Sequence, residues 1–184
     1  MSGCQKNSSK EVNCLDYNKK YIEYVHKERD SALYYLDKAI ECEPQGLFFP
    51  FEKAKFYSRE GSYEDAAKAI EPFLTEEYPE IIGYYGVLFL KLEQPKKAEK
   101  FLIRSYELIK EKSFDPDDYF GYSQSLIKIG LENYFKGSDI AIESLENFED
   151  QGKWEGQKRF AEVLNEVIKS KSKEEVLYFI YNLD

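Results

Sequence analysis

The sequence predicts an all-α protein in which short antiparallel helical hairpins follow one another along the chain. Apolar side chains recur with a helical period of about 3.6 residues over most of the 184 residues. Only 10 glycines and 6 prolines interrupt this pattern, which favours long helices over a turn-rich β fold. Similar short sequences also return at intervals close to the length of one helical hairpin.

The first hairpin is expected to follow residues 1–12, whose polar composition is typical of a flexible leader or tether. A turn is expected at residues 27–30, and Pro44 closes the second helix. The side chains assigned to the buried faces are Tyr17, Tyr21, Tyr24 and Val25 in the first helix, then Ala32, Leu33, Leu36, Ala39 and Ile40 in the second.

Glycine and proline bound the second and third hairpins. The second turns at Glu60-Gly61, and the third opens at Pro79 and turns at residues 93–95. The positions assigned to their buried faces are Phe51, Ala54, Phe56, Tyr57, Ala66, Ala67, Ile70, Phe73 and Leu74, then Ile82, Tyr85, Gly86, Phe89, Leu90, Ala98, Leu102, Ser105 and Leu108.

A fourth, longer hairpin is expected after Pro116, with its turn at Gly137-Ser138. The hairpins then cover residues 13–150, and residues 151–184 are expected to form two capping helices. Ser172 and Glu175 have the spacing of a capping box at the start of the second one.

An alanine recurs near the start of each returning helix. Ala32, Ala66, Ala98 and Ala141 are separated by 34, 32 and 43 residues. A small residue at this point allows the two helices of one hairpin to approach closely, whereas a larger side chain would push them apart.

With this spacing, the chain resembles the tetratricopeptide repeat (TPR) family, whose hairpins repeat about every 34 residues. The residues that carry the resemblance are Ala54, Tyr57, Gly61, Tyr63, Ala66, Ile70 and Phe73, followed by Gly86, Phe89, Ala98 and Leu102. The tryptophan of the family's first helix is absent. The resemblance implies a right-handed superhelical solenoid of about four TPR-like hairpins plus C-terminal capping helices. The alternative is an unrelated array of helical hairpins, which would also have to bury its apolar faces between neighbours.

Composition argues against several classes of function. A formal net charge of −9 opposes binding to nucleic acid. No apolar run reaches the roughly 18 residues that span a bilayer. His26 is the only histidine, and no glycine-rich phosphate loop is present. We therefore expect no catalytic residue, no metal site and no cofactor.

Two cysteines are predicted to form a disulfide. Cys14 and Cys42 lie at equal distances from the turn at residues 27–30, so an antiparallel hairpin would place them side by side. Two buried free thiols are the alternative.

Cys4 has a different context. The sequence Ser2-Gly3-Cys4 resembles the end of a bacterial lipobox, and the polar residues after it resemble a tether. On this interpretation an apolar signal has been removed or truncated, Cys4 is lipidated, and the protein faces the periplasm, where a disulfide is stable. The alternative is a cytoplasmic protein with three free thiols.

The resemblance also implies a binding face, because in the TPR family the first helices of successive repeats line a concave groove. The row assigned to this groove is Phe51, Lys55, Ser58, Arg59, Tyr84, Val87, Lys91, Phe120, Gln124 and Lys128. Cations alternate there with aromatic rings, which suits a peptide with acidic and apolar side chains. Ordinary exposed cations at helix ends are the alternative.

The predicted function is protein–protein interaction without catalysis, by an adaptor or assembly factor that holds another protein or a peptide. The alternative is an immunity or inhibitor protein whose acidic helical surface neutralises a secreted toxin.

Overall fold

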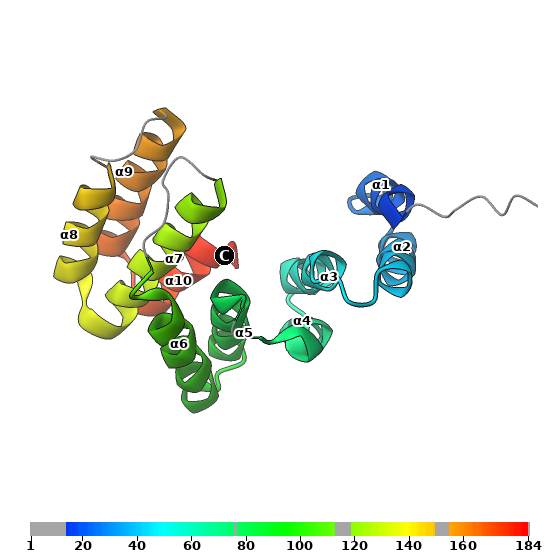
Figure 1. Ribbon diagram of the computed structural model, residues 1–184, viewed down its shortest axis with the longest axis horizontal. Helices are drawn as coiled ribbons and strands as arrows, with labels where there is room; N and C mark the ends of the chain where they lie inside the picture. Colours follow the sequence, from blue (N-terminus) through cyan, green and yellow to red (C-terminus); the bar gives the residue numbers. More distant parts are fainter. Residues whose placement is uncertain (1–13, 76, 113–118, 150–154, 184) are drawn as a thin grey trace, which may run out of the picture.

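The computed structural model describes residues 14–75, 77–112, 119–149 and 155–183. The expected leader, with Cys4, lies outside these residues. Within them the chain is all-helical and forms ten α-helices and one 3-10 helix (Figure 1). The elements are α1 (Cys14–Tyr24), α2 (Arg29–Cys42), α3 (Phe48–Arg59), α4 (Tyr63–Ile70), η1 (Glu71–Phe73), α5 (Pro79–Lys91), α6 (Pro95–Ile109), α7 (Tyr119–Lys136), α8 (Ser138–Glu149), α9 (Glu155–Ser170) and α10 (Lys173–Tyr181).

The helices pair as the sequence predicted. The pairs α1–α2, α3–α4, α5–α6 and α7–α8 each form an antiparallel hairpin, and the second helix of each pair also packs against the helix that follows it. Gly61 has a φ of +75° at the turn between α3 and α4, a conformation that glycine adopts without steric cost. Hairpins of this size cover their apolar faces by contact with the next hairpin.

The recurring alanines lie where the helices of each hairpin meet. Ala32, Ala66, Ala98 and Ala141 are all completely buried, with 0% of their surface exposed. The prediction of a small residue at this contact is confirmed. Larger side chains would have to separate the helices, because protein interiors are close-packed.

One helix is shorter than the sequence analysis predicted. Phe73 and Leu74 were assigned to the returning helix of the second hairpin, but α4 ends at Ile70 and is followed by η1. The reason is Pro72, which has no backbone N–H to donate and whose ring clashes with the preceding turn of an α-helix.

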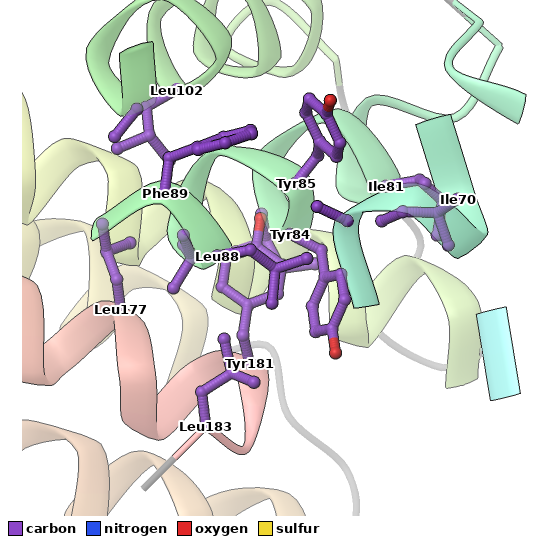
Figure 2. Close-up of a cluster of buried hydrophobic side chains, with 14 of the residues drawn as sticks. Ile70, Ile81, Tyr84, Tyr85, Leu88, Phe89, Leu102, Leu177, Tyr181 and Leu183 are labelled. Carbon is purple, nitrogen blue, oxygen red and sulfur yellow. The ribbon is translucent and has the colours of Figure 1, made fainter. Parts of the chain in front are cut away.

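Aromatic side chains fill the central core, which lies between α4, α5, α6, α7 and α10. Figure 2 shows part of this cluster, with Tyr84 of α5 lying next to Tyr181 of α10. The rings of Tyr85 and Phe101 meet edge to face with centroids 4.7 Å apart, a geometry that the ring quadrupoles favour.

Two smaller clusters lie on either side of this core. One joins α7 to α8, α9 and α10, and the other joins α1 and α2 to α3. Figure 1 shows the helices α1–α4 extending away from the more compact group formed by α5–α10. No helix in the described ranges is long and apolar enough to cross a membrane.

The last two helices differ in position from the capping pair that was expected. α9 packs against α8, as a helix that covers the end of the array would. α10 instead folds back along the array and packs against α7 and α5 (Figure 1). Its start has the predicted capping box, in which the Ser172 and Glu175 side chains each bond the other's backbone N–H.

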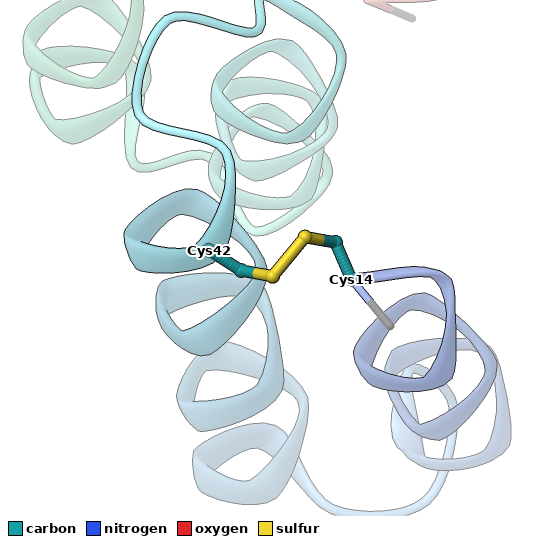
Figure 3. Close-up of a disulfide and its surroundings, with 2 residues drawn as sticks. All are labelled: Cys14 and Cys42. Atoms are coloured by element: carbon teal, nitrogen blue, oxygen red, sulfur yellow. A yellow bond between two sulfur atoms is a disulfide. The ribbon is translucent and has the colours of Figure 1, made fainter. Parts of the chain in front are cut away.

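A disulfide links the two helices of the first hairpin. Cys14 begins α1 and Cys42 ends α2, and the structure joins their sulfur atoms with the Cα atoms 5.7 Å apart (Figure 3). This separation is in the usual range for a disulfide. The pairing in the protein's own compartment remains a prediction.

Candidate protein-binding site

A stripe of side chains along α3 combines three residues of the predicted binding row with Phe48, which the row did not include. Phe48, Phe51, Lys55 and Arg59 recur every three or four residues, so they share one face of the helix. Phe48 is 55% exposed, although it is a large apolar residue. Phe51 and Lys55 are half-buried and Arg59 is exposed. We call these four residues the α3 stripe.

The stripe rests on a rigid aromatic base. The ring of Phe51 meets that of Tyr84 in α5 edge to face, with centroids 5.1 Å apart. Two helical turns further along α3, the Ser58 and Tyr84 hydroxyls share a hydrogen bond of 2.7 Å. Both groups are buried, and a buried polar pair that is satisfied in this way fixes the position of its two helices.

The cations of the stripe are oriented by neighbouring groups. Lys55 forms an ion pair with Glu52 on the same helix, and its ammonium nitrogen lies 5.1 Å from the centroid of the Phe51 ring. Arg59 donates a hydrogen bond of 3.0 Å to the hydroxyl of Tyr21 in α1. Lys55 is therefore held near the half-buried ring of Phe51, and Arg59 beside the hydroxyl of buried Tyr21. Both cations can form charge-assisted hydrogen bonds with carboxylates.

Lys91 lies apart from these two cations. Its ammonium nitrogen is 3.8 Å from the ring centroid of Tyr178 in α10 and 6.0 Å from that of Tyr63. The contact is a cation–π interaction. Lys91 thus contacts α10, and it marks the point where α10 begins to cover α5.

Four members of the predicted row are not accessible. Tyr84 and Val87 are 1% and 0% exposed, and both belong to the central core. Ser58 and Gln124 are also buried. The expectation that Tyr84 receives an apolar anchor of the partner is therefore wrong, because Phe51 and α10 already cover its ring.

The row is also interrupted along α7. Gln124 donates a hydrogen bond of 3.1 Å to Glu80 at the start of α5, where burial raises the pKa of the Glu80 carboxyl. Lys128 is half-buried one turn further along. The Phe120 side chain lies outside the described residues. The structure therefore brings together Phe51, Lys55 and Arg59 but does not continue the row along α5 and α7.

Sequence reasoning missed Phe48. Its position three residues before Phe51 and seven before Lys55 would have placed it on the same helical face. The prediction began the second hairpin's apolar pattern at Phe51, and so left Phe48 without a role. Among the residues that the structure describes, no three His, Cys, Asp or Glu side chains gather as a metal site requires.

Raising the pH above 10 should destabilise the protein through Tyr84. Burial raises the pKa of Tyr84 from 10.0 to about 12, so the folded state keeps a proton that the unfolded chain releases. The stabilisation is fully present below pH 10 and is lost as the pH rises to about 12. For a residue this buried, the loss should reach about 2–3 kcal/mol.

Urea denaturation at several values of pH measures this effect. The free energy of unfolding of Tyr84→Phe should fall less steeply between pH 10 and 12 than that of the wild type. The difference in slope should correspond to about one proton, because the variant has no phenol to ionise at this position. A variant with the same slope as the wild type would show that Tyr84 does not control the alkaline transition.

Comparison with known proteins agrees with the arrangement of hairpins. The chain is similar to a TPR repeat-containing protein. That relative is MJ1428 of Methanocaldococcus jannaschii, which is 28% identical over 111 residues. The match covers 58% of this chain but only 19% of the relative's length. No protein-family model matches the chain, and no solved structure is significantly similar to it.

The relative's name describes TPR repeats, which supports the TPR resemblance.

Proposed function

We propose that this chain is a non-enzymatic scaffold that holds another protein or a peptide against the α3 stripe. Its hairpins would form a right-handed superhelical solenoid of the TPR class. The observation that carries the proposal is the stripe itself, in which exposed Phe48 and half-buried Phe51 lie beside Lys55 and Arg59 on one helical face.

The chemistry of the stripe defines the segment that it would bind. Two aromatic side chains offer apolar contact area at low entropic cost, and two cations offer charge-assisted hydrogen bonds. The rest of the protein carries a net negative charge, so an acidic partner is attracted to the stripe and repelled elsewhere. The partner segment would therefore carry apolar side chains next to carboxylates.

Reversing the charge of the stripe should abolish partner binding. The variant Lys55→Glu/Arg59→Glu should bind the partner at least tenfold more weakly, since carboxylates would face carboxylates. The partner is recovered by affinity capture from the native host with the wild-type chain. Binding of the recovered partner to each variant is then measured by titration, and circular dichroism verifies that helix content is retained.

A matched control separates the stripe from overall charge. The variant Lys68→Glu/Lys96→Glu makes the same change of net charge at two exposed lysines of α4 and α6. It should bind like the wild type. Equal binding by all three proteins would contradict the proposal, and equal weakening by both variants would show that only net charge matters.

We also propose a location for the scaffold. Lipidation at Cys4 would attach it to the periplasmic face of a bacterial membrane. The support for this is the lipobox-like sequence around Cys4 together with the pairing of Cys14 and Cys42, which an oxidising compartment would preserve.

A further inference from the structure

The face that α5 and α7 turn toward α10 is shaped to receive a helix. α10 buries Val176, Leu177 and Tyr181 when it packs there. The ring centroids of Tyr181 and Tyr84 are 6.0 Å apart. Figure 2 shows Leu177 and Tyr181 directed from α10 into the cluster of α5 side chains.

Two glycines make room for this helix. A Cβ atom on Gly83 of α5 would lie 2.1 Å from the Tyr181 hydroxyl oxygen. A Cβ atom on Gly130 of α7 would lie 2.3 Å from Cδ1 of Ile180. Both distances are far inside van der Waals contact, so a side chain at either glycine would force Tyr181 or Ile180 of α10 to shift.

Glycine in the interior of a helix costs about 1 kcal/mol relative to alanine. Gly83 and Gly130 both lie inside their helices. Each one meets a different side chain of α10, and a Cβ atom on Gly83 would also lie 2.8 Å from the Ser105 hydroxyl oxygen of α6. The face of α5 and α7 is thus adapted to an occupant with apolar side chains at positions i, i+1, i+4 and i+5.

α10 is a self-contained helix. The Ser172–Glu175 capping box closes its start. At its end Asn182 adopts a left-handed conformation with a φ of 54°, and the Leu183 backbone N–H bonds the Tyr178 carbonyl at 2.8 Å. The exposed residues Lys171 and Ser172 link it to α9 in the chain. α10 also packs on α9, where the rings of Phe179 and Phe160 stack with centroids 5.6 Å apart. Both ends satisfy their backbone groups without help from the rest of the protein.

We propose that the face of α5 and α7 is a helix-binding site that the chain fills with its own α10. The occupant from outside would be an amphipathic helix of a partner that repeats the spacing of Val176, Leu177, Ile180 and Tyr181, and α10 competes with it. This inference goes beyond the α3 stripe and does not depend on it, because the two surfaces use different residues.

The test uses the full chain with a specific protease site inserted between Lys171 and Ser172. After cleavage, the probe is a fluorescein-labelled peptide of residues 172–183, and its anisotropy is recorded. We expect saturable binding to the cleaved chain and at least tenfold weaker binding to the uncleaved chain, where α10 is tethered in place. Adding Gly130→Ala to the cleaved chain should weaken binding at least tenfold, since the new Cβ meets Ile180.

Other outcomes would overturn the proposal. If cleavage melts α5–α8, as circular dichroism would show, α10 is part of one cooperative core and no preformed site exists. If the labelled peptide binds neither form, or binds the Gly130→Ala chain equally well, the face does not act as a helix receptor.

A second measurement needs no insertion. In the unmodified chain, hydrogen exchange should show amides of α10 at least tenfold less protected than those of α5, because a displaceable helix opens locally. Equal protection of the two helices would contradict the proposal. Neither result bears on partner binding at the α3 stripe, so the two proposals can fail separately.

Discussion

Replacing Cys14 and Cys42 together by serine should lower the stability of the α1–α2 hairpin by about 3–4 kcal/mol, the chain-entropy value for a closed loop of this size. The two cysteines are 28 residues apart. Within α1, all of which is described, Tyr21 is the only buried residue. Its hydroxyl, bonded to Arg59, gives α1 a polar contact with α3.

The loss should be local. Hydrogen exchange should show α1 losing protection in the Cys14→Ser/Cys42→Ser protein, while α5 and α6 remain protected, because their core lies in a separate cluster. The matched control is Cys4→Ser, which removes a thiol outside the hairpin and should leave exchange unchanged. If α1 is equally protected with and without the two cysteines, the disulfide does not hold it in place.

This result also bears on the binding site. Arg59 belongs to the α3 stripe and donates its hydrogen bond to Tyr21. When α1 detaches, Arg59 loses the group that orients it. The double-serine variant should therefore bind a partner less tightly even though none of its changed residues lies in the stripe.

The sequence was sufficient to predict the helical hairpins because the positions at which their helices begin and end depend on local chemistry. Pro79 and Pro95 each begin a helix in the structure, where a missing N–H costs nothing. The buried alanines are likewise recognisable, since their spacing follows from the length of one hairpin. The early end of α4 before Pro72 could also have been predicted, because proline lacks the N–H that the interior of a helix needs.

The position of α10 could not be predicted in this way. Its apolar spacing shows that one face is buried, but it does not identify the surface that covers that face. α10 contacts α5, whose residues are about ninety positions away in the chain. Such a contact depends on how the whole chain packs and not on the local sequence of α10. Gly83 and Gly130 were the sequence features that could have indicated this contact, because a glycine inside a helix often marks the close approach of another element.

The same difficulty explains the errors in the binding row. Tyr84, Val87 and Gln124 were assigned to a groove that the resemblance implies, but all three side chains are buried. α10 packs against α5 and α7, and Tyr84 and Val87 belong to the central core that α10 shares. Along α3, which α10 does not cover, Phe51 and Lys55 keep part of their surface accessible.

Truncating Leu102 should have a large effect on stability. Leu102 is completely buried in the central core, and replacing a buried leucine by alanine typically costs about 2–5 kcal/mol. Its side chain also limits Gly86 of α5. A Cβ atom on Gly86 would lie 3.0 Å from Cγ and Cδ2 of Leu102 and 3.2 Å from the Ala98 carbonyl oxygen. The two positions should therefore be coupled.

In the wild-type background, Gly86→Ala should destabilise the protein by about 1 kcal/mol, because crowding outweighs the helix propensity gained. In the Leu102→Ala background, the crowding by Leu102 is removed. The same change should then stabilise the protein by up to about 1 kcal/mol. Urea denaturation of the four proteins measures the coupling, which we expect at about 1–2 kcal/mol.

Gly61→Ala provides the control for this cycle. Gly61 has a positive φ and would meet no atom within 4 Å if it carried a Cβ, so its substitution causes backbone strain without crowding. Its effect should add to that of Leu102→Ala. If Gly86→Ala were equally additive, Leu102 would not be what keeps position 86 small, and the close contact between α5 and α6 would need another explanation. If Gly86→Ala destabilises the wild type but stabilises the Leu102→Ala protein, the Leu102 side chain of α6 explains why position 86 is a glycine.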